Sequence, residues 1–373
     1  MLNEIELSQN DVARNDITDT PDAEAFLERT CDIINAGAQS IMISIGHQSG
    51  LFDVMSKLEA KTSQQIADAA ELTERYVREW LAVMVTADIV NYDSHNRTYH
   101  LPEAHAACLT RNSQLGNVAV YAQFIPMMGA VQNHTLRCLE SGGGTSYGDY
   151  PCFHQVMSED SEQSVVSSLF EVLLPMIQGI GAQLETGIQV LDVGCGKGLA
   201  LIAMAERYPQ SIFTGYDLCE EAISEATRIV KNKGLQNVSF SIKNLSEFNE
   251  KQQYNLITSF DAIHDQRDPQ DLIHSIHRAL KPNGVYLMQD IGGSSNLENN
   301  LSFPMASLLY SISFTHCTPI SIGQGGEGLG AMWGWETALA MLENAGFATI
   351  ERHVLPHDPM NVWFVNHKEK RND

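Results

Sequence analysis

Ile188-Gln-Val-Leu-Asp-Val-Gly-Cys-Gly-Lys-Gly198 is the stretch that decides the fold of this chain. Its apolar residues up to Val193 predict a strand, its three alternating glycines predict a tight turn, and Leu199 to Glu206 predicts a helix. Glycines let a ligand approach the backbone, and the first turn of a helix leaves amide groups free to bind it. The stretch therefore predicts a site for a nucleotide-like ligand.

The glycine spacing narrows the choice of ligand. It is Gly-x-Gly-x-Gly, without the third glycine of the dinucleotide pattern Gly-x-Gly-x-x-Gly, and Asp192 stands two residues before the first glycine. This difference favours a methyl-donor site over a dinucleotide site.

Strands and helices alternate from Gly187 onward, which is typical of a mostly parallel sheet. We predict an α/β fold: a Rossmann-like, seven-stranded, mostly parallel sheet with helices on both faces. The expected strands are residues 189–193, 212–217, 237–242, 254–260, 283–290, 347–353 and 360–366.

Composition limits the classes of function. A chain of 373 residues with 43% apolar residues is long enough for two domains, and its net charge of −23 disfavours binding to nucleic acid or to an anionic membrane. The seven cysteines are scattered without a Cys-x-x-Cys pair, so neither a disulfide framework nor a zinc knuckle is indicated. The N-terminus lacks the features of a signal peptide, and no run of about 18 apolar residues occurs. We expect a cytoplasmic protein without a transmembrane segment.

The N-terminal part predicts a small helical domain. Residues 1–20 are polar and acidic and are expected to form a flexible tail. Within residues 21–110, apolar residues from Phe26 to Ile45 predict a long buried helix that is interrupted near Gly46. Two further helices at 62–70 and 74–87, followed by a hairpin at 89–101, complete an expected winged-helix domain.

The charge of this winged helix opposes DNA binding. Between Thr62 and Leu101 there are three basic and six acidic residues, and the helix in the recognition position has no lysine. A helix that enters a DNA groove needs the opposite charge. We therefore favour a packing or dimerisation module, which predicts a homodimer.

Residues 111–180 are expected to form a helical connection and a lid over the substrate, with a flexible glycine loop at 142–144. Aromatic residues after this loop either line a substrate pocket or form an ordinary core at a junction between loop and helix. They are Tyr147, Tyr150, Phe153 and His154.

The ends of the second and third strands carry polar residues where an open α/β sheet binds ligands. Asp217 ends the second strand, 19 residues after Gly198, where a carboxylate can accept hydrogen bonds from ribose hydroxyls. Asn244 could bind an adenine edge beside Leu245, although asparagine is also favoured in turns without any ligand.

The end of the fourth strand should face the reacting group. His264 is the one obvious base there, and the neighbouring acids Asp261 and Asp265 could orient it. The alternative is a structural histidine that holds the turn before a helix.

Three other features of the sequence could take part in metal binding, reactivity or the substrate pocket. His274 and His277 lie three residues apart without a third ligand, so we expect no metal site. Cys195 could be reactive near a helix N-terminus, but a small residue that fills the turn is the simpler interpretation. The glycine-rich segment 322–334, with Met332 and Trp333, forms either a wall of the substrate pocket or a long mobile loop.

Taken in order, these motifs resemble those of class I S-adenosylmethionine-dependent methyltransferases over residues 181–373. The matching residues are Val190 to Gly198, Asp217, Asn244-Leu245 and Leu280-Lys-Pro-Asn-Gly284. The resemblance implies a last strand that is antiparallel and S-adenosylmethionine as cofactor. It also implies a set of cofactor-binding residues, which is Asp192, Gly194, Cys195, Gly196, Gly198, Asp217, Leu218, Asn244, Leu245 and Phe260.

Together with the winged helix, the chain resembles dimeric small-molecule O-methyltransferases and a bacterial-type group of winged-helix methyltransferases. In the former a catalytic His-Asp pair follows the fourth strand, which here corresponds to His264 and Asp265, with Gln266 where tryptophan is usual. The expected function is methyl transfer to an O or N nucleophile of a small molecule. The alternative is a transcriptional regulator that senses the cofactor without catalysis.

Overall fold

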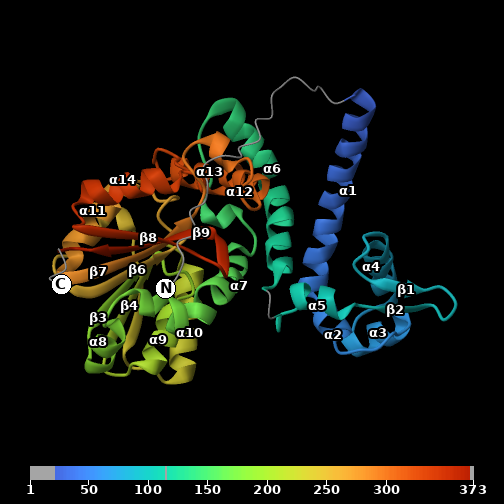
Figure 1. Ribbon diagram of the computed structural model, residues 1–373, viewed down its shortest axis with the longest axis horizontal. Helices are drawn as coiled ribbons and strands as arrows, with labels where there is room; N and C mark the ends of the chain where they lie inside the picture. The colour runs from blue at the N-terminus through green and yellow to red at the C-terminus, as the bar shows by residue number, and fades with distance from the viewer. Residues whose placement is uncertain (1–21, 114–115, 370–373) are drawn as a thin grey trace, which may run out of the picture.

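The computed structural model describes residues 22–113 and 116–369, so the expected tail at 1–20 lies outside the described residues. Figure 1 shows a small N-terminal part beside a larger part that contains the sheet. The helix α6 (Phe124–Ser141) runs between α1 (Ala23–Gln48) and the larger part.

The larger part is built on a seven-stranded sheet in the order β5-β4-β3-β6-β7-β9-β8. Only β9 runs antiparallel to its neighbours β7 and β8, and every other pairing in this sheet is parallel. The predicted fold class is confirmed, including the antiparallel last strand. The strands are β3 (Gln189–Val193), β4 (Ile212–Asp217), β5 (Val238–Ile242), β6 (Tyr254–Phe260), β7 (Leu280–Ile291), β8 (Thr349–Leu355) and β9 (Asp358–His367).

The strand order predicts where this sheet would bind a ligand. The chain leaves β3 toward β4 and β5 on one side and then returns to β6 on the other side of β3. The carboxyl ends of β3 and β6 therefore flank the point where the strand order reverses, which is where open α/β sheets bind ligands.

Two cores cover the two faces of the sheet. Val190 packs with Leu201 and Phe213 on one face, whereas its neighbour Leu191 packs with Ile273 and Leu342 on the other, because successive side chains of a strand point to opposite faces. The flanking helices are α8 (Ile180–Thr186), α9 (Leu199–Arg207), α10 (Glu220–Lys233), α11 (Pro269–Ala279) and α14 (Trp335–Ala345).

The N-terminal part contains the expected helix-turn-helix and wing. Thr62 and Gln65 form a capping box at the start of the first of its two helices. The elements after α1 are α2 (Leu51–Met55), α3 (Ser63–Ala70), α4 (Glu74–Thr86), β1 (Asn91–Asp93), β2 (Thr98–His100) and α5 (Glu103–Leu109).

The prediction of a buried first helix was wrong. Helix α1 runs through Gly46, where the absence of a side chain lets Trp80 and Phe52 pack closely, since a Cβ there would lie 2.5 Å from Trp80. Its apolar residues face outward instead, with Phe26 59% and Ile34 68% exposed. The helix therefore presents an apolar face that residues 22–113 and 116–369 leave uncovered.

The two glycine-rich segments pack against each other. A Cβ at Gly144 would lie 2.2 Å from the amide nitrogen of Gly323, and the amide of Thr145 donates to the carbonyl of Pro319 at 2.9 Å. Gly144 at the end of the glycine loop is thus packed on helix α13 (Thr318–Gly323), whereas Gly142 and Gly143 are exposed, and the flexibility of the loop stays a prediction. The segments around them are η2 (Tyr147–Asp149), α7 (Phe153–Ser164), α12 (Ala306–Ile312) and η8 (Ser313–Cys317).

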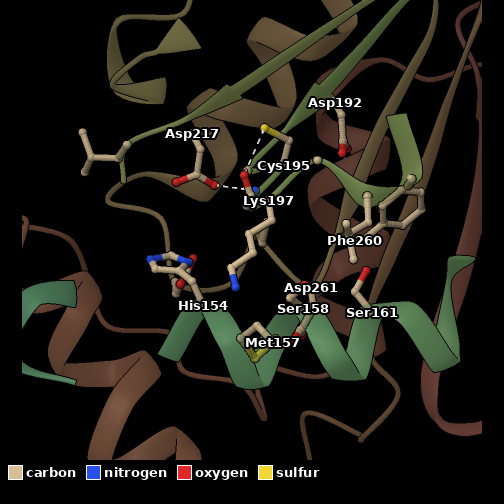
Figure 2. A pocket seen from close by; sticks show the side chains of 18 of the residues that line it. His154, Met157, Ser158, Ser161, Asp192, Cys195, Lys197, Asp217, Phe260 and Asp261 are labelled. Carbon is tan, nitrogen blue, oxygen red and sulfur yellow. Dashed lines mark hydrogen bonds between the residues drawn. The ribbon is translucent and has the colours of Figure 1, made fainter. Parts of the chain in front are cut away.

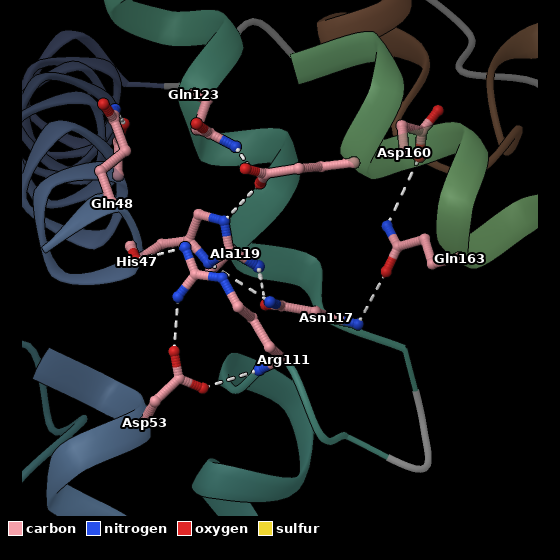
Figure 3. Close-up of polar contacts among 11 residues, drawn as sticks. His47, Gln48, Asp53, Arg111, Asn117, Ala119, Gln123, Asp160 and Gln163 are labelled. Carbon is pink, nitrogen blue, oxygen red and sulfur yellow. Dashed lines mark hydrogen bonds and ion pairs between the residues drawn. The ribbon is translucent and has the colours of Figure 1, made fainter. Parts of the chain in front are cut away.

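A polar network joins the two parts of the chain (Figure 3). His47 of α1 lies 2.6 Å from Glu159 of α7, and Gln123 donates to the same carboxylate at 3.0 Å. Asp160, the next residue along α7, lines the site described below. The winged-helix part therefore contacts the helix that closes that site.

Among residues 22–113 and 116–369, no single helix is long and apolar enough to cross a membrane. Two consecutive helical segments, Phe153–Met176 and Ile180–Thr186, are together long and apolar enough to span a membrane, but the chain bends by 106° between them. Their large apolar side chains, including Leu169, Leu173 and Leu184, belong to the buried core.

Candidate functional site

The three glycines of the turn after β3 have two different roles. All three have positive φ angles. A Cβ at Gly194 would lie 2.5 Å from Ala262 and one at Gly198 would lie 2.2 Å from Phe240, but one at Gly196 would meet nothing within 4 Å. The first and third glycines thus allow close packing, and the middle glycine borders open space.

Asp217 ties this turn to the end of β4. One carboxylate oxygen accepts a hydrogen bond from the amide of Gly196 and the other from the amide of Cys219, each at 2.8 Å. The carboxylate is thereby held beside the glycine turn, at the carboxyl end of β4.

A cavity opens over the turn, and all ten predicted cofactor-binding residues line it, from Asp192 to Phe260. Asn244 also accepts hydrogen bonds from the amide and the hydroxyl of Ser246, so it holds a turn while lining the cavity. The turn-forming role of Asn244 is therefore observed, and its contact with an adenine stays a prediction.

The far wall of the cavity was missed by sequence reasoning. Helix α7 lies across the opening in Figure 2, with Met157, Ser158 and Ser161 facing the glycine turn. Its polar residues follow no known motif, so only the fold brings them to the site. Further missed lining residues are Asp160, Ser164, Lys197, Gln289 and Gln324.

Burial changes the pKa of two residues on the glycine-turn side of the cavity. Asp192 is 2% exposed, and burial raises its pKa to about 7 although Thr258 donates to it at 2.7 Å. Burial also raises the pKa of the Cys195 thiol, which opposes formation of a reactive thiolate. Cys195 therefore fills the turn as a small neutral side chain.

A second cavity adjoins the first and is largely apolar. The two share the wall residues Phe153, Met157, Asp160, Asp261 and Asp265. The second is closed by side chains from α6, α7, α12 and the ends of β7 and β9, which include Phe124, Ile291, Leu308, Leu309, Ile312 and Met360. A small molecule in this cavity would lie beside a ligand in the first.

His264 lines the second cavity and is oriented by Asp290, a residue that the sequence analysis did not single out. The two side chains are buried, with His264 Nδ1 2.8 Å from Asp290 Oδ1. The same oxygen accepts from the indole of Trp333 at 3.0 Å. Burial opposes a charge on His264, but Asp290 and Cys317 together outweigh burial and raise the pKa of the imidazole well above its usual value. An acidic residue at the end of the predicted fifth strand was the sequence signal that could have identified Asp290.

The acids expected to orient His264 are placed differently. Asp265 accepts a hydrogen bond from the hydroxyl of Tyr147 at 2.6 Å, and Asp261 Oδ1 lies 3.8 Å from His264 Nδ1, beyond hydrogen-bond distance. The partner of His264 is on β7 because the ends of β6 and β7 are adjacent in the sheet, which the sequence does not display.

The expected substrate-pocket residues divide into two groups. Tyr147, Phe153 and His154 line the first cavity, and Phe153 lines the second as well. The other three line neither cavity. Tyr150 donates to the carbonyl of Thr315 at 2.7 Å, Met332 is buried against Gly293, and Trp333 holds Asp290. These three support the walls rather than face a ligand.

Comparisons with known proteins agree with this architecture. Residues 37–111 match the family described as the Rv2258c-like winged HTH domain, and residues 184–346 match the family described as a methyltransferase domain. A ubiquinone biosynthesis O-methyltransferase of Histophilus somni is 33% identical over 109 residues, which are 28% of this chain and 44% of that protein. The chain thus spans less than half the length of this curated relative.

Solved structures share the fold over nearly the whole chain. Human N-acetylserotonin methyltransferase is 15% identical with a TM-score of 0.66, covering 94% of this chain and 99% of that one. An O-methyltransferase family protein from Burkholderia thailandensis is 16% identical with a TM-score of 0.62, covering 93% and 98%. Residues 37–111 are thus a winged helix-turn-helix domain, and residues 184–346 are a methyltransferase domain with the class I S-adenosylmethionine-dependent fold.

Proposed function

We propose that this protein is an S-adenosylmethionine-dependent methyltransferase that transfers a methyl group to an O or N nucleophile of a small molecule. The observation that carries the proposal is the meeting of two cavities. The first is lined by the glycine turn and Asp217, and the second contains His264 on the far side of the shared wall.

The first cavity fits the cofactor residue by residue. The open position at Gly196 leaves room for the methionine part, Asp217 would accept from the ribose, and Asn244 with Leu245 would hold the adenine. When bound, the cofactor supplies a methyl group on a positively charged sulfur, so the chain mainly has to align the acceptor with it.

His264 is proposed as the base that takes the acceptor proton. Asp290 holds Nδ1, and the side chain of Cys317 is a further hydrogen-bond partner of the ring, so Nε2 would accept the proton of a molecule in the second cavity at a pH above the raised pKa, where the imidazole is neutral. Asp265, the predicted partner of this base, lies in the shared wall and instead positions Tyr147, which lines the first cavity.

A small molecule is the proposed acceptor, since the winged helix carries little free positive charge. On α4, Arg75 lies 2.5 Å from Glu79 and Arg78 lies 3.3 Å from Glu74, so each arginine is paired within its own helix. A groove-reading helix needs unpaired positive charge.

The second copy of the chain is the proposed partner of α1. Several large apolar residues along this helix are exposed, and a second copy would bury them. They are Phe26, Leu27, Ile33, Ile34, Ile41 and Ile45. The cytoplasmic location stays a prediction from the sequence.

Calorimetric titration with S-adenosylmethionine tests the cofactor assignment. We expect one binding site per chain that Gly196→Val blocks, because the new side chain enters the open space over the turn. The exposed α11 variant Asp271→Asn is the control and should bind normally. Absence of binding to the unaltered protein, or normal binding by Gly196→Val, would contradict the proposal.

A further inference from the structure

Helix α7 forms a wall of both cavities, which are called the cofactor cavity and the acceptor cavity below. Met157 and Asp160 of this helix line the two cavities alike. Of the 12 residues of α7, all of which the structure describes, only Val156 and Ser164 are buried. An element with few buried contacts opens locally at a low cost in free energy. Contacts other than core packing must therefore help to hold α7 over the cavities.

The backbone departs from regular α-helical geometry at both ends of α7. Cys152, directly before the helix, has a φ of 60°. After Val165 the chain continues as a 3₁₀ turn, η3 (Val166–Ser168), and then as a π-helix, η4 (Leu169–Leu173). Changes of helical geometry of this kind often mark hinges. The helix is thus a separate unit whose place depends on what binds it from the side.

Polar side chains bind α7 on a side that faces neither cavity (Figure 3). Glu159 and Gln163 lie four residues apart on this helix and line neither the cofactor cavity nor the acceptor cavity. His47 Nε2 of α1 lies 2.6 Å from Glu159 Oε2, and Gln123 donates to the same oxygen at 3.0 Å. The side-chain oxygen of Gln163 accepts from the backbone amide of Asn117 at 3.0 Å. The helix is therefore attached to α1 and to the segment that follows the winged helix.

The neighbours of His47 determine which ring nitrogen donates. The backbone amide of Ala119 donates to the side-chain oxygen of Asn117 at 3.1 Å, so Asn117 presents its NH₂ group to His47 Nδ1, 3.3 Å away. An amide NH₂ group can only donate, so Nδ1 accepts and Nε2 carries the ring proton. Nε2 then donates to the carboxylate of Glu159, and hydrogen bonds to a charged group are roughly twice as strong as neutral ones. Both ring nitrogens of this buried histidine are thus used to join the two parts of the chain.

The same contacts extend to a residue that lines both cavities. Gln163 Nε2 donates to Asp160 Oδ1 at 3.4 Å, and the hydroxyl of Tyr121 hydrogen-bonds to the same carboxyl group. Tyr121 belongs to the short helix η1 (Val118–Gln123) and lines the acceptor cavity. A shift of α7 away from α1 would therefore displace the shared wall at Asp160 and Met157.

We propose that His47 is a positioning residue for methyl transfer, which holds α7 over the cofactor and acceptor cavities through its hydrogen bond to Glu159. His47 lines neither cavity, so it acts on the ligands only through α7. The winged-helix part is then required for cofactor binding, besides its proposed contact with a second copy. This inference rests on the proposed function, which assigns S-adenosylmethionine to the cofactor cavity.

Calorimetric titration of S-adenosylmethionine into full-length variants tests the inference. His47→Leu and Glu159→Leu should each raise the dissociation constant about tenfold, because loss of a charge-assisted hydrogen bond lowers the fraction of chains with α7 in place. The double variant should bind within about twofold of either single variant, because both substitutions remove the same contact. His47→Gln should keep most of the affinity, since an amide can donate to Glu159 and accept from Asn117.

Control variants separate positioning of α7 from loss of stability. Arg111 hydrogen-bonds to Asp53 and to the carbonyl of His47, so these contacts stay within the N-terminal part. Arg111→Gln should lower the free energy of unfolding but leave the dissociation constant unchanged. Glu162→Leu, at an exposed position of α7, should change neither quantity. If Arg111→Gln weakened cofactor binding as much as His47→Leu does, general loosening of the N-terminal part would explain both effects and the inference would be overturned.

Amide hydrogen exchange of α7 reports on the same contact without any ligand. In the absence of cofactor, His47→Leu should raise the exchange rates of α7 amides about tenfold, whereas Arg111→Gln should not. Glu159 is 25% exposed, so Glu159→Leu provides the same test if His47→Leu does not fold.

The two measurements distinguish the inference from the proposed function. Unchanged exchange in both leucine variants, or faster exchange with unchanged affinity for S-adenosylmethionine, would overturn the role of His47. Faster exchange together with no binding of S-adenosylmethionine by the unaltered protein would reject the proposed function, but not the attachment of α7 to His47.

Discussion

The two adjoining cavities are built in different ways. The ten predicted residues between Asp192 and Phe260 form one side of the cofactor cavity and stand at the carboxyl ends of four neighbouring strands, while α7 forms the other side. The acceptor cavity draws its lining from segments spread between Tyr121 and Asn361. A site built from strand ends and backbone amides can be predicted from the local sequence pattern. A site built by side-chain packing can be predicted only when the whole fold is known.

Acidic side chains lie at the boundary between the two cavities. Asp261 and Asp265 lie in the shared wall, and His264, between them in sequence, lines only the acceptor cavity. Substitutions on either side of this wall should therefore affect one ligand and spare the other.

The largest expected effect is on turnover in the acceptor cavity. His264→Gln should lower kcat for an identified acceptor by about 10²–10⁴, the usual contribution of a positioned base. The dissociation constant for S-adenosylmethionine should change little, because His264 does not line that cavity. Rapid-quench turnover and calorimetry measure the two quantities. The matched substitution His274→Gln on α11, outside both cavities, should leave both unchanged, and full turnover by His264→Gln would show that alignment alone supports the reaction.

The next effect is on the cofactor side. Asp217→Ala removes a carboxylate that two backbone amides hold in place, so S-adenosylmethionine should bind about 100-fold more weakly, since hydrogen bonds to charged groups contribute about 1.5–3 kcal/mol each. Calorimetric titration measures the loss. Equal affinity in the variant and the unaltered protein would break the assignment of Asp217 to the cofactor.

Burial of acids on the cofactor side predicts a pH dependence of stability. The pKa of Asp192 is about 7 in the folded chain and ordinarily 3.8, so between these values the folded state holds a proton that the unfolded chain has lost. The free energy of unfolding should therefore fall as pH rises from about 4 to 7. Asp192→Asn should reduce this fall by on the order of 4 kcal/mol, as denaturant titrations at several pH values would measure.

Other buried acids should contribute to the same fall in the free energy of unfolding. Burial also raises the pKa of Asp160 to about 6 and of Asp261 to about 7, so some of the fall should remain in Asp192→Asn. An unchanged slope in this variant would show that Asp192 is charged in the folded protein.

The smallest effect is expected at the wall itself. Tyr147→Phe removes the hydrogen bond to Asp265 without changing the shape of the ring, and Tyr147 lines only the cofactor cavity, so the dissociation constant for S-adenosylmethionine should rise about fivefold, equivalent to roughly 1 kcal/mol. The KM for an acceptor should stay within a factor of about two of that of the unaltered protein, since a typical hydrogen bond contributes little net free energy. A larger change in KM than in cofactor affinity would place Tyr147 on the acceptor side of the wall.

Several local features could be predicted from sequence because short-range rules govern them. The strand, glycine turn and helix around Gly196 follow from periodicity and from the conformational freedom of glycine. The capping box at Thr62 follows from its own four residues. Neither needs information about distant segments.

Other features could not be predicted because they depend on which segments meet. Asp290 orients His264 only because β7 lies beside β6, and Met157 faces the glycine turn only because α7 crosses the opening. The exposure of Ile34 was predicted wrongly, since an apolar helical stripe looks the same whether its own chain or another covers it.

The sequence by itself therefore determined the α/β fold, the order of its motifs and the residues on the strand-end side of the cofactor cavity, because these depend on spacing along a few neighbouring strands. Only the tertiary structure decided the partner of His264, the docking of Gly144 on Gly323 and the contact of His47 with Glu159. Those contacts join residues far apart in the chain, and their distances are set by packing and strand order rather than by any local pattern.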